Sequence, residues 1–341
     1  MATSSRRGAR VLAVALLLGA VLAGCKPAPP LGTPVPSQAQ TPNIPNIADP
    51  SVLLDNGTYY VYGSNNFRFT PVTRISDPLR IYDLVTWQLN TTSAMPTLPP
   101  WAAIGYFWAL SVAKFGNQYV MFFAMGRQNA PDPNNPQCIG RAVASSPQGP
   151  FTPEPVPFSC GLGATGGALD PSVFTDAEGK HWLHAAFGNT NSPIYALPLN
   201  AAGDGLFGRP GGYAAHTSYP VLGRTQPWEA PFIENPSMVF DPSTGTYLLA
   251  YSAGDWRSAS YSTGLARCST PTGMCTKLTS GPWLSRSASR TGPGGLSFFP
   301  QLGGGTLAVY ASYPPGTEGT GGRRQGTVQV VDLGWSPRLT G

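Results

Sequence analysis

The sequence is poor in charged residues and in histidine. Only 11% of its 341 residues are charged, and three are histidines. Long charged amphipathic runs are missing, which excludes helical bundles, coiled coils and doubly wound α/β enzymes. Glycine and proline, in contrast, contribute 41 and 37 residues. Because 41% of the residues are hydrophobic, the chain can still fill a large core, and we expect an all-β protein.

The net charge of +5 depends on a short N-terminal segment. Arg6, Arg7 and Arg10 precede the first acidic residue, and without residues 1–24 the net charge is +2. No run rich in lysine and arginine remains that could follow a phosphate backbone. We therefore expect no nucleic-acid partner.

The first 45 residues have the composition of a leader and a tether. Residues 1–24 show the order of an export signal, with a basic start, an apolar stretch and small residues. The apolar stretch, 11–22, is shorter than the about 20 residues of a membrane-spanning helix. It ends in LAGC, which resembles a bacterial lipobox and predicts lipidation of Cys25, with an ordinary secretory signal as the alternative. Residues 25–45, rich in Pro, Gln, Thr and Ser, predict a semi-extended tether.

Five cysteines leave one without a partner, and Cys25 is the natural odd one. The other four allow three pairings, and short loops favour Cys138 with Cys160 and Cys268 with Cys275. Each such loop would stabilise the fold by roughly 2–3 kcal/mol. No C-x-x-C spacing is present, so we expect no cysteine metal site.

A repeat of about sixty residues decides the predicted architecture. Five segments each contain a small polar residue, a short apolar run, a glycine turn and an aromatic-rich strand. Their serines stand at 51, 111, 172, 237 and 297, with separations of 60, 61, 65 and 60. Five four-stranded units at this period predict a five-bladed β-propeller over residues 46–341, and the near-equal intervals disfavour a β-sandwich with chance repeats.

Equivalent positions of such a ring converge at the mouth of the central channel. Two residues before each serine stand, in chain order, Asp49, Ala109, Asp170, Asn235 and Gly295. Glu234 lies one residue further back, so three acids are expected at one funnel. The offset would turn Glu234 to the other face of an ideal strand unless the backbone bulges.

Glu229 competes with Glu234 for a place at the funnel. Glu234 precedes the glycine turn at Gly245 by 11 residues and Glu229 by 16, and the shorter interval is the better match to the other repeats. We therefore favour Glu234. Hydrolysis of a glycosidic bond needs a proton donor and a second carboxylate, and a third acid can raise the pKa of the donor.

The motifs together carry a resemblance over nearly all of the chain after the tether. They are IADPSV at 47–52, FWA at 107–109, LDPSVF at 169–174, IENPSM at 233–238 and GPGG at 292–295. In this combination they resemble glycoside hydrolase family 43. The resemblance implies a five-bladed propeller that cleaves arabinose- or xylose-containing polysaccharides, such as arabinan and arabinoxylan, with inversion.

The same resemblance implies a role for each acid. Asp49 would be the general base, Asp170 the residue that modulates the donor's pKa and orients it, and Glu234 the general acid. Trp108 and Phe67 are candidates for stacking on a sugar ring. The resemblance implies no required cofactor, and the presence of a structural Ca²⁺ in the channel is left as an open question.

The resulting hypothesis is an exported bacterial lipoprotein at the cell surface that is a monomeric glycoside hydrolase. It would touch the membrane only through its lipid. Two alternatives stay open: a carbohydrate-binding propeller without catalysis, suggested by the altered second and fifth repeats, and a retaining fructan or sucrose hydrolase on the same fold.

Overall fold

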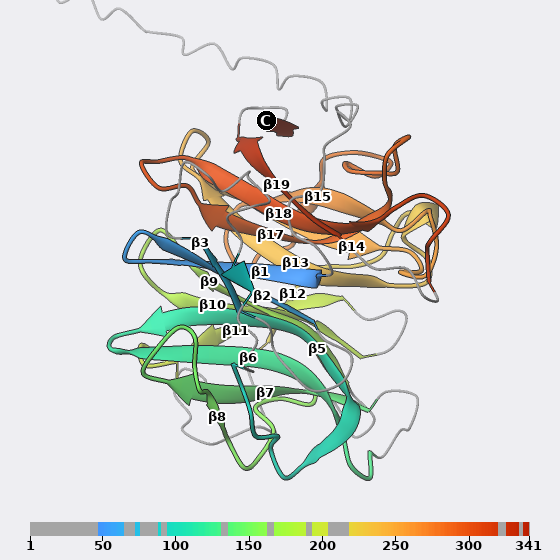
Figure 1. Ribbon diagram of the computed structural model, residues 1–341. Coiled ribbons are helices and arrows are strands. Elements are labelled where there is room, and N and C mark those ends of the chain that lie inside the picture. Colours follow the sequence, from blue (N-terminus) through green and yellow to red (C-terminus); the bar gives the residue numbers. More distant parts are fainter. Residues whose placement is uncertain are drawn as a thin grey trace, which may run out of the picture. The chain divides into compact units, whose positions relative to one another are not determined.

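The computed structural model describes residues 47–64, 72–75, 88–89, 94–130, 136–161, 167–188, 193–203, 218–319, 325–333 and 337–340. These residues form five antiparallel sheets of four strands each, with a single short 3₁₀ helix (Figure 1). The all-β prediction is therefore confirmed. No helix within these ranges is both long enough and apolar enough to cross a membrane.

Each sheet is built from one continuous part of the chain, and we call the sheets blades 1 to 5. Blade 1 contains β1 (Ala48–Asp55), β2 (Thr58–Ser64), β3 (Val72–Ile75) and β4 (Gln88–Leu89). Blade 2 contains β5 (Ala102–Phe115), β6 (Gln118–Arg127), β7 (Gln137–Ala144) and β8 (Thr152–Pro153). Blade 3 contains β9 (Ala168–Thr175), β10 (His181–Phe187), β11 (Ile194–Leu199) and β12 (Tyr219–Leu222).

The last two blades follow the same plan. Blade 4 contains β13 (Ile233–Asp241), β14 (Thr246–Ala253), β15 (Ser262–Cys268) and β16 (Thr276–Lys277), and the helix η3 (Pro227–Glu229) precedes it. Blade 5 contains β17 (Thr291–Pro300), β18 (Thr306–Tyr313), β19 (Gln325–Asp332) and β20 (Arg338–Thr340). In each blade, neighbours in the sheet are also neighbours in sequence, as hairpin connections produce.

The first strands of the blades form a closed ring. Each contacts the next in the order β1, β5, β9, β13 and β17, and β17 contacts β1 again. The serines of the repeat help to join them: Ser111 Oγ accepts a hydrogen bond from the N–H of Val173 (3.1 Å), and Ser237 Oγ accepts one from the N–H of Phe298 (2.9 Å). These bonds cross from one blade to the next. The five-bladed propeller predicted from the repeat is confirmed.

The hydrophobic core is divided among the seams between blades. Its five clusters of buried side chains each combine residues of two neighbouring blades. Alternation along β2 shows why: Tyr59 and Val61 pack towards Phe299 of blade 5, whereas Tyr62 belongs to the cluster shared with blade 2. Each strand thus serves two seams, and the blades stabilise one another.

Both predicted disulfides are present. Cys138 is bonded to Cys160 within blade 2, and Cys268 is bonded to Cys275 across the β15–β16 turn of blade 4. The second disulfide closes a loop that reaches blade 3. There the neutral His184, whose pKa is lowered by burial to about 4, donates from Nε2 to Pro271 O (3.0 Å). The N–H of Cys275 donates to Val221 O (2.8 Å), so the loop is hydrogen-bonded to the neighbouring blade.

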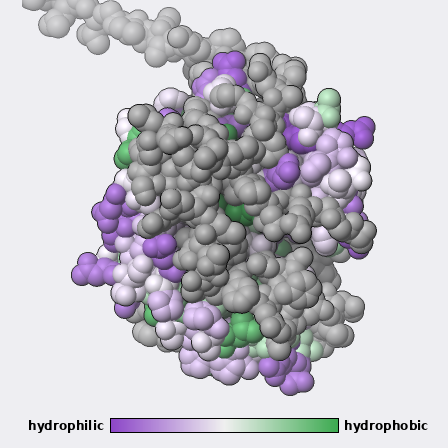
Figure 2. Space-filling view, viewed as in Figure 1, coloured by the Kyte–Doolittle hydropathy of each residue, from purple (hydrophilic) through white to green (hydrophobic). Residues whose placement is uncertain are grey.

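Large hydrophobic side chains are exposed only singly among the described residues. They are Leu98, Val156, Tyr219, Trp256, Met274 and Leu302. The described part of the face in Figure 2 accordingly shows hydrophilic side chains around its edge and small separate hydrophobic patches. Scattered apolar residues of this kind are normal on a protein surface, so the concave centre of the ring is where a site is expected.

Candidate functional site

The starts of the five inner strands line one open hollow, whose empty space, with the open solvent at its mouth included, is about 320 Å³. Each strand contributes the same three positions of the repeat. They are Asp49–Ser51, Ala109–Ser111, Asp170–Ser172, Asn235–Ser237 and Gly295–Ser297. Residues about sixty positions apart in sequence therefore meet at one place, as the repeat predicted.

A β-bulge sets the direction of the side chains at this level. In blade 4, Glu234 pairs with Ser252 and Ser237 pairs with Ala250, so three steps on β13 oppose two on β14. The residue after Glu234, Asn235, has a left-handed φ of 47°. Asp49 (45°) and Asp170 (55°) share this conformation at the equivalent positions of β1 and β9. The bulge that Glu234 would need to join the funnel is thus present.

Asp170 is the most enclosed of the three acids. Its side chain is buried, and Oδ2 accepts a hydrogen bond from the N–H of Asn235 (2.9 Å). Burial and the negative charges of Glu234 and Asp49 raise the pKa of Asp170 well above its usual value, although the hydrogen bond opposes the shift. The structure therefore brings the three sequence-predicted acids together.

A comparison among blades explains why Asp170 binds this N–H. In blades 1 and 4 a serine does so: Ser64 Oγ accepts from Ala109 N (2.7 Å), and Ser252 Oγ accepts from Gly295 N (2.8 Å). The equivalent position of blade 3 is Ala186, which pairs with Leu169 and has no hydroxyl. The carboxylate of Asp170 takes the place of the missing serine, so one side chain both joins two blades and lies in the site.

Asp49 and Glu234 have different hydrogen-bond partners. Asp49 Oδ2 accepts from Ser64 Oγ (2.6 Å), and Asp49 Oδ1 lies 3.4 Å from Asn235 Nδ2. Glu234 Oε1 accepts from the hydroxyl of Tyr261 (2.6 Å), which also contacts Asn235 Oδ1 (2.9 Å). Both acids are half-buried, and Asp49 lines the hollow.

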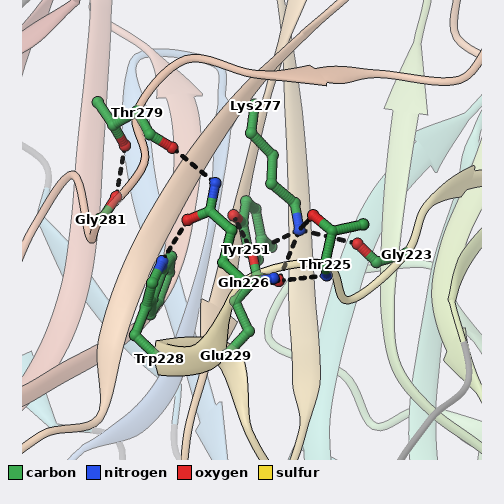
Figure 3. Close-up of polar contacts among 9 residues, drawn as sticks. All are labelled: Gly223, Thr225, Gln226, Trp228, Glu229, Tyr251, Lys277, Thr279 and Gly281. Atoms are coloured by element: carbon green, nitrogen blue, oxygen red, sulfur yellow. Dashed lines mark hydrogen bonds and ion pairs between the residues drawn. The ribbon is translucent and has the colours of Figure 1, made fainter.

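Glu229, the last residue of η3, lies in a separate polar cluster (Figure 3). Its side chain is completely buried, 2.5 Å from Lys277 Nζ, and it accepts hydrogen bonds from Tyr251 Oη and from the N–H groups of Thr225 and Gln226. Burial alone would raise the pKa of Glu229, but these donors, Lys277 foremost, hold it below its usual value. An ionised, fully paired carboxylate cannot donate a proton to a substrate, which supports the choice of Glu234.

Among the described residues, no group of three or more His, Cys, Asp and Glu side chains could hold a metal ion. Serine hydroxyls also line the hollow, and those of Ser111 and Ser237 already accept hydrogen bonds between blades. These serines do not supply the carboxylates that Ca²⁺ favours.

The remaining predicted site residues have different outcomes. Trp108 is half-buried in β5, directly before Ala109 of the hollow, and its stacking on a sugar stays a prediction. Phe67 and Cys25 lie outside the described residues. Tyr261 and Ser64 were not found from the sequence, because they stand outside the repeated motif.

Comparison with known proteins places the chain in a family. The model of glycosyl hydrolases family 43 matches residues 41–336, so the chain belongs to this family. It is 27% identical to an extracellular endo-α-(1→5)-L-arabinanase 2 of Bacillus subtilis (strain 168), over 67% of this chain and 49% of that protein. It is 24% identical to a β-D-galactofuranosidase, xynD, of Aspergillus niger, over 70% of this chain and 65% of that protein. The chain thus spans about half to two thirds of the length of these relatives.

Solved structures share the fold. A thermostable family-43 glycoside hydrolase superposes with a TM-score of 0.72 and 23% identity, covering 88% of this chain and 95% of that one. An α-L-arabinofuranosidase from Lactobacillus brevis gives a TM-score of 0.70 at 19% identity, covering 87% and 94%. Both cover nearly the whole propeller.

We expect Asp170→Asn to be more stable than the wild type at pH 7. The pKa of Asp170 is raised in the folded state, so above about 3.8, the usual value, the unfolded chain ionises first and is favoured. Relative to the wild type, the variant should therefore gain stability as the pH rises through this window. Chemical denaturation of both proteins at pH 3 and pH 7 measures this gain. A difference in unfolding free energy that is the same at both pH values would contradict the raised pKa, and Asp332→Asn serves as an exposed control.

Glu229→Gln should have the opposite pH dependence. Breaking a buried ion pair costs about 3–5 kcal/mol, and we expect a loss of this order at pH 7. Because the pKa of Glu229 is lowered in the folded state, this contribution is present above its usual value of 4.5 and is lost as the pH falls through the lowered pKa. Unfolding free energies from pH 7 to pH 3 test this, with Glu178→Gln, a change at an exposed glutamate, as the control. A deficit that does not shrink in acid would refute the ion-pair explanation.

Proposed function

We propose that this chain hydrolyses glycosidic bonds of arabinose- or xylose-containing polysaccharides or oligosaccharides with inversion. The proximity of Asp49, Asp170 and Glu234 carries the proposal, since Asp49 and Asp170 line the hollow and the charge of Glu234 acts on Asp170. Family membership supports it, as do the names of relatives, which include arabinanases and a xylosidase/arabinosidase of Humicola insolens. Arabinose versus xylose is a question for substrate screening.

In the proposed mechanism, Asp49 removes a proton from the water that attacks the anomeric carbon. The hydrogen bond from Ser64 holds Asp49 Oδ2, and Oδ1, which lies 3.4 Å from Asn235 Nδ2, takes the proton of the water. Glu234 gives its proton to the glycosidic oxygen as the bond to the sugar breaks. Asp170 lies close enough to Glu234 and Asp49 for mutual repulsion, so the three carboxyl groups disfavour being ionised all at once, and a proton is retained among them before that step. Asp170 also fixes the backbone of Asn235.

Asp49→Asn and Glu234→Gln should each lower kcat by at least about 10²-fold, the low end of a general acid or base contribution. The rates are measured with aryl α-L-arabinofuranosides and aryl β-D-xylosides as substrates. The products formed from linear arabinan, branched arabinan and xylan are then compared. NMR of the first-formed anomer reports inversion or retention. Asp332→Asn, an exposed carboxylate on β19, should leave kcat unchanged.

Three results would contradict the proposal. Wild-type rates in both variants would remove Asp49 and Glu234 from the chemistry. Binding of the oligosaccharides without hydrolysis by the wild type would indicate a carbohydrate-binding propeller, and a retained anomer would indicate the fructan or sucrose hydrolase class.

We also propose that the chain is exported and anchored by a lipid at Cys25. The order of residues 1–24 and the two disulfides support export. Expressed in a bacterium, the full chain should incorporate radiolabelled palmitate and partition with membranes, whereas Cys25→Ser should do neither. Secretion of an unlabelled wild type into the medium would favour an ordinary secretory signal.

A further inference from the structure

Tyr261 is held rigidly between the acid of blade 4 and the first strand of blade 5. Its side chain is buried, with 2% of its surface exposed. A Cβ added to Gly294 would lie 2.2 Å from Tyr261 Cε1, so the absence of a side chain at Gly294 is what makes room for the ring. The N–H of Tyr261 donates to Ser258 O (3.3 Å). The hydroxyl is therefore presented at a fixed point beside the hollow.

This hydroxyl contacts two oxygens but has one hydrogen. It lies 2.6 Å from Glu234 Oε1 and 2.9 Å from Asn235 Oδ1. A phenol donates one hydrogen bond and accepts others, and an amide oxygen can only accept. For Glu234 to pass a proton to a substrate, that proton must be on Oε2. Oε1 is then a neutral carbonyl oxygen, a weaker acceptor than the amide oxygen of Asn235, so Tyr261 donates to Asn235.

The ionised form of Glu234 requires the other arrangement. A carboxylate is a stronger acceptor than an amide oxygen, so Tyr261 then donates to Glu234, and Asn235 Oδ1 receives no hydrogen from the phenol. The amide of Asn235 is at the same time the group that faces the opposite acid, with Nδ2 3.4 Å from Asp49 Oδ1. The hydrogen of Tyr261 thus determines whether the Asn235 amide is held by a hydrogen bond to its Oδ1.

We propose that Tyr261 is a positioning residue that couples the protonation of Glu234 to the orientation of the Asn235 amide, and through it to Asp49. The proposal rests on the proposed function for its meaning in catalysis. The proton lost by Glu234 goes to the glycosidic oxygen, while the hydrogen of Tyr261 stays on its oxygen and changes only its acceptor. Proton donation by the acid therefore releases the amide beside the base at the same step.

The first test measures the pKa of Glu234 directly and needs no activity. In full-length protein labelled with ¹³C at glutamate side chains, the carboxyl resonance absent from Glu234→Gln is followed against pH. Tyr261→Phe should raise the pKa of Glu234 by about one unit, because the ionised form loses a charge-assisted donor. Tyr247→Phe, a buried tyrosine of the same blade whose hydroxyl contacts Ala177 N, should leave it unchanged.

A second variant tests the competition for the hydrogen. Asn235→Gly keeps the left-handed backbone, since Gly295 has φ 62° at the equivalent position. With Asn235 Oδ1 removed, Tyr261 donates only to Glu234, and the pKa of Glu234 should fall. In the double variant with Tyr261→Phe this decrease should disappear. An unchanged pKa in Tyr261→Phe, or a decrease in the double variant equal to that in Asn235→Gly, would overturn the inference in protein that folds normally.

Kinetics separate this inference from the proposed function. Tyr261→Phe should lower kcat about tenfold on a glycoside with a poor leaving group and much less on a dinitrophenyl glycoside, whose departure needs little protonation. The alkaline limb of its pH profile should move upwards with the pKa of Glu234. A wild type without hydrolase activity would refute the proposed function and leave the NMR result standing. An unmoved alkaline limb in an active variant would refute the role of Tyr261 alone.

Discussion

The bulge at the start of the inner strands is the constraint on which the site depends. One extra residue in the left-handed region brings Asp49, Asp170 and Asn235 to the hollow at equivalent points of three blades. Non-glycine residues adopt this conformation at a cost of about 1–3 kcal/mol each. Such strain persists only where the surroundings over-determine it, and here the pairing of each bulged strand and the neighbouring blades do so.

Burial of Asp170 shows that the site and the stability of the ring are in conflict. A carboxylate placed near two others in an enclosed position disfavours the folded state at neutral pH. The same side chain offsets part of this cost, because it accepts the backbone N–H of Asn235 where blade 3 has Ala186 in place of a serine. The five apolar seams supply the remaining stability.

The sequence allowed the ring, the local disulfides and the meeting of the three acids to be predicted, because each leaves a spaced pattern. The serines at near-equal intervals mark the inner strands, and short separations favour the two cysteine pairs. Contacts made once leave no such pattern. Tyr261 reaches Glu234 from a loop 27 residues away, and Lys277 pairs with Glu229 over 48 residues. Neither partner follows from period or composition.

The disulfide between Cys268 and Cys275 ties the folding of the ring to an oxidising compartment. The two cysteines are only seven positions apart. Within the loop that they close, Pro271 and Cys275 form hydrogen bonds with His184 and Val221 of another blade. Reduction would therefore loosen a joint between blades 3 and 4 rather than a surface hairpin alone. Assembly of the ring is in this way linked to the thiol chemistry of the surrounding compartment.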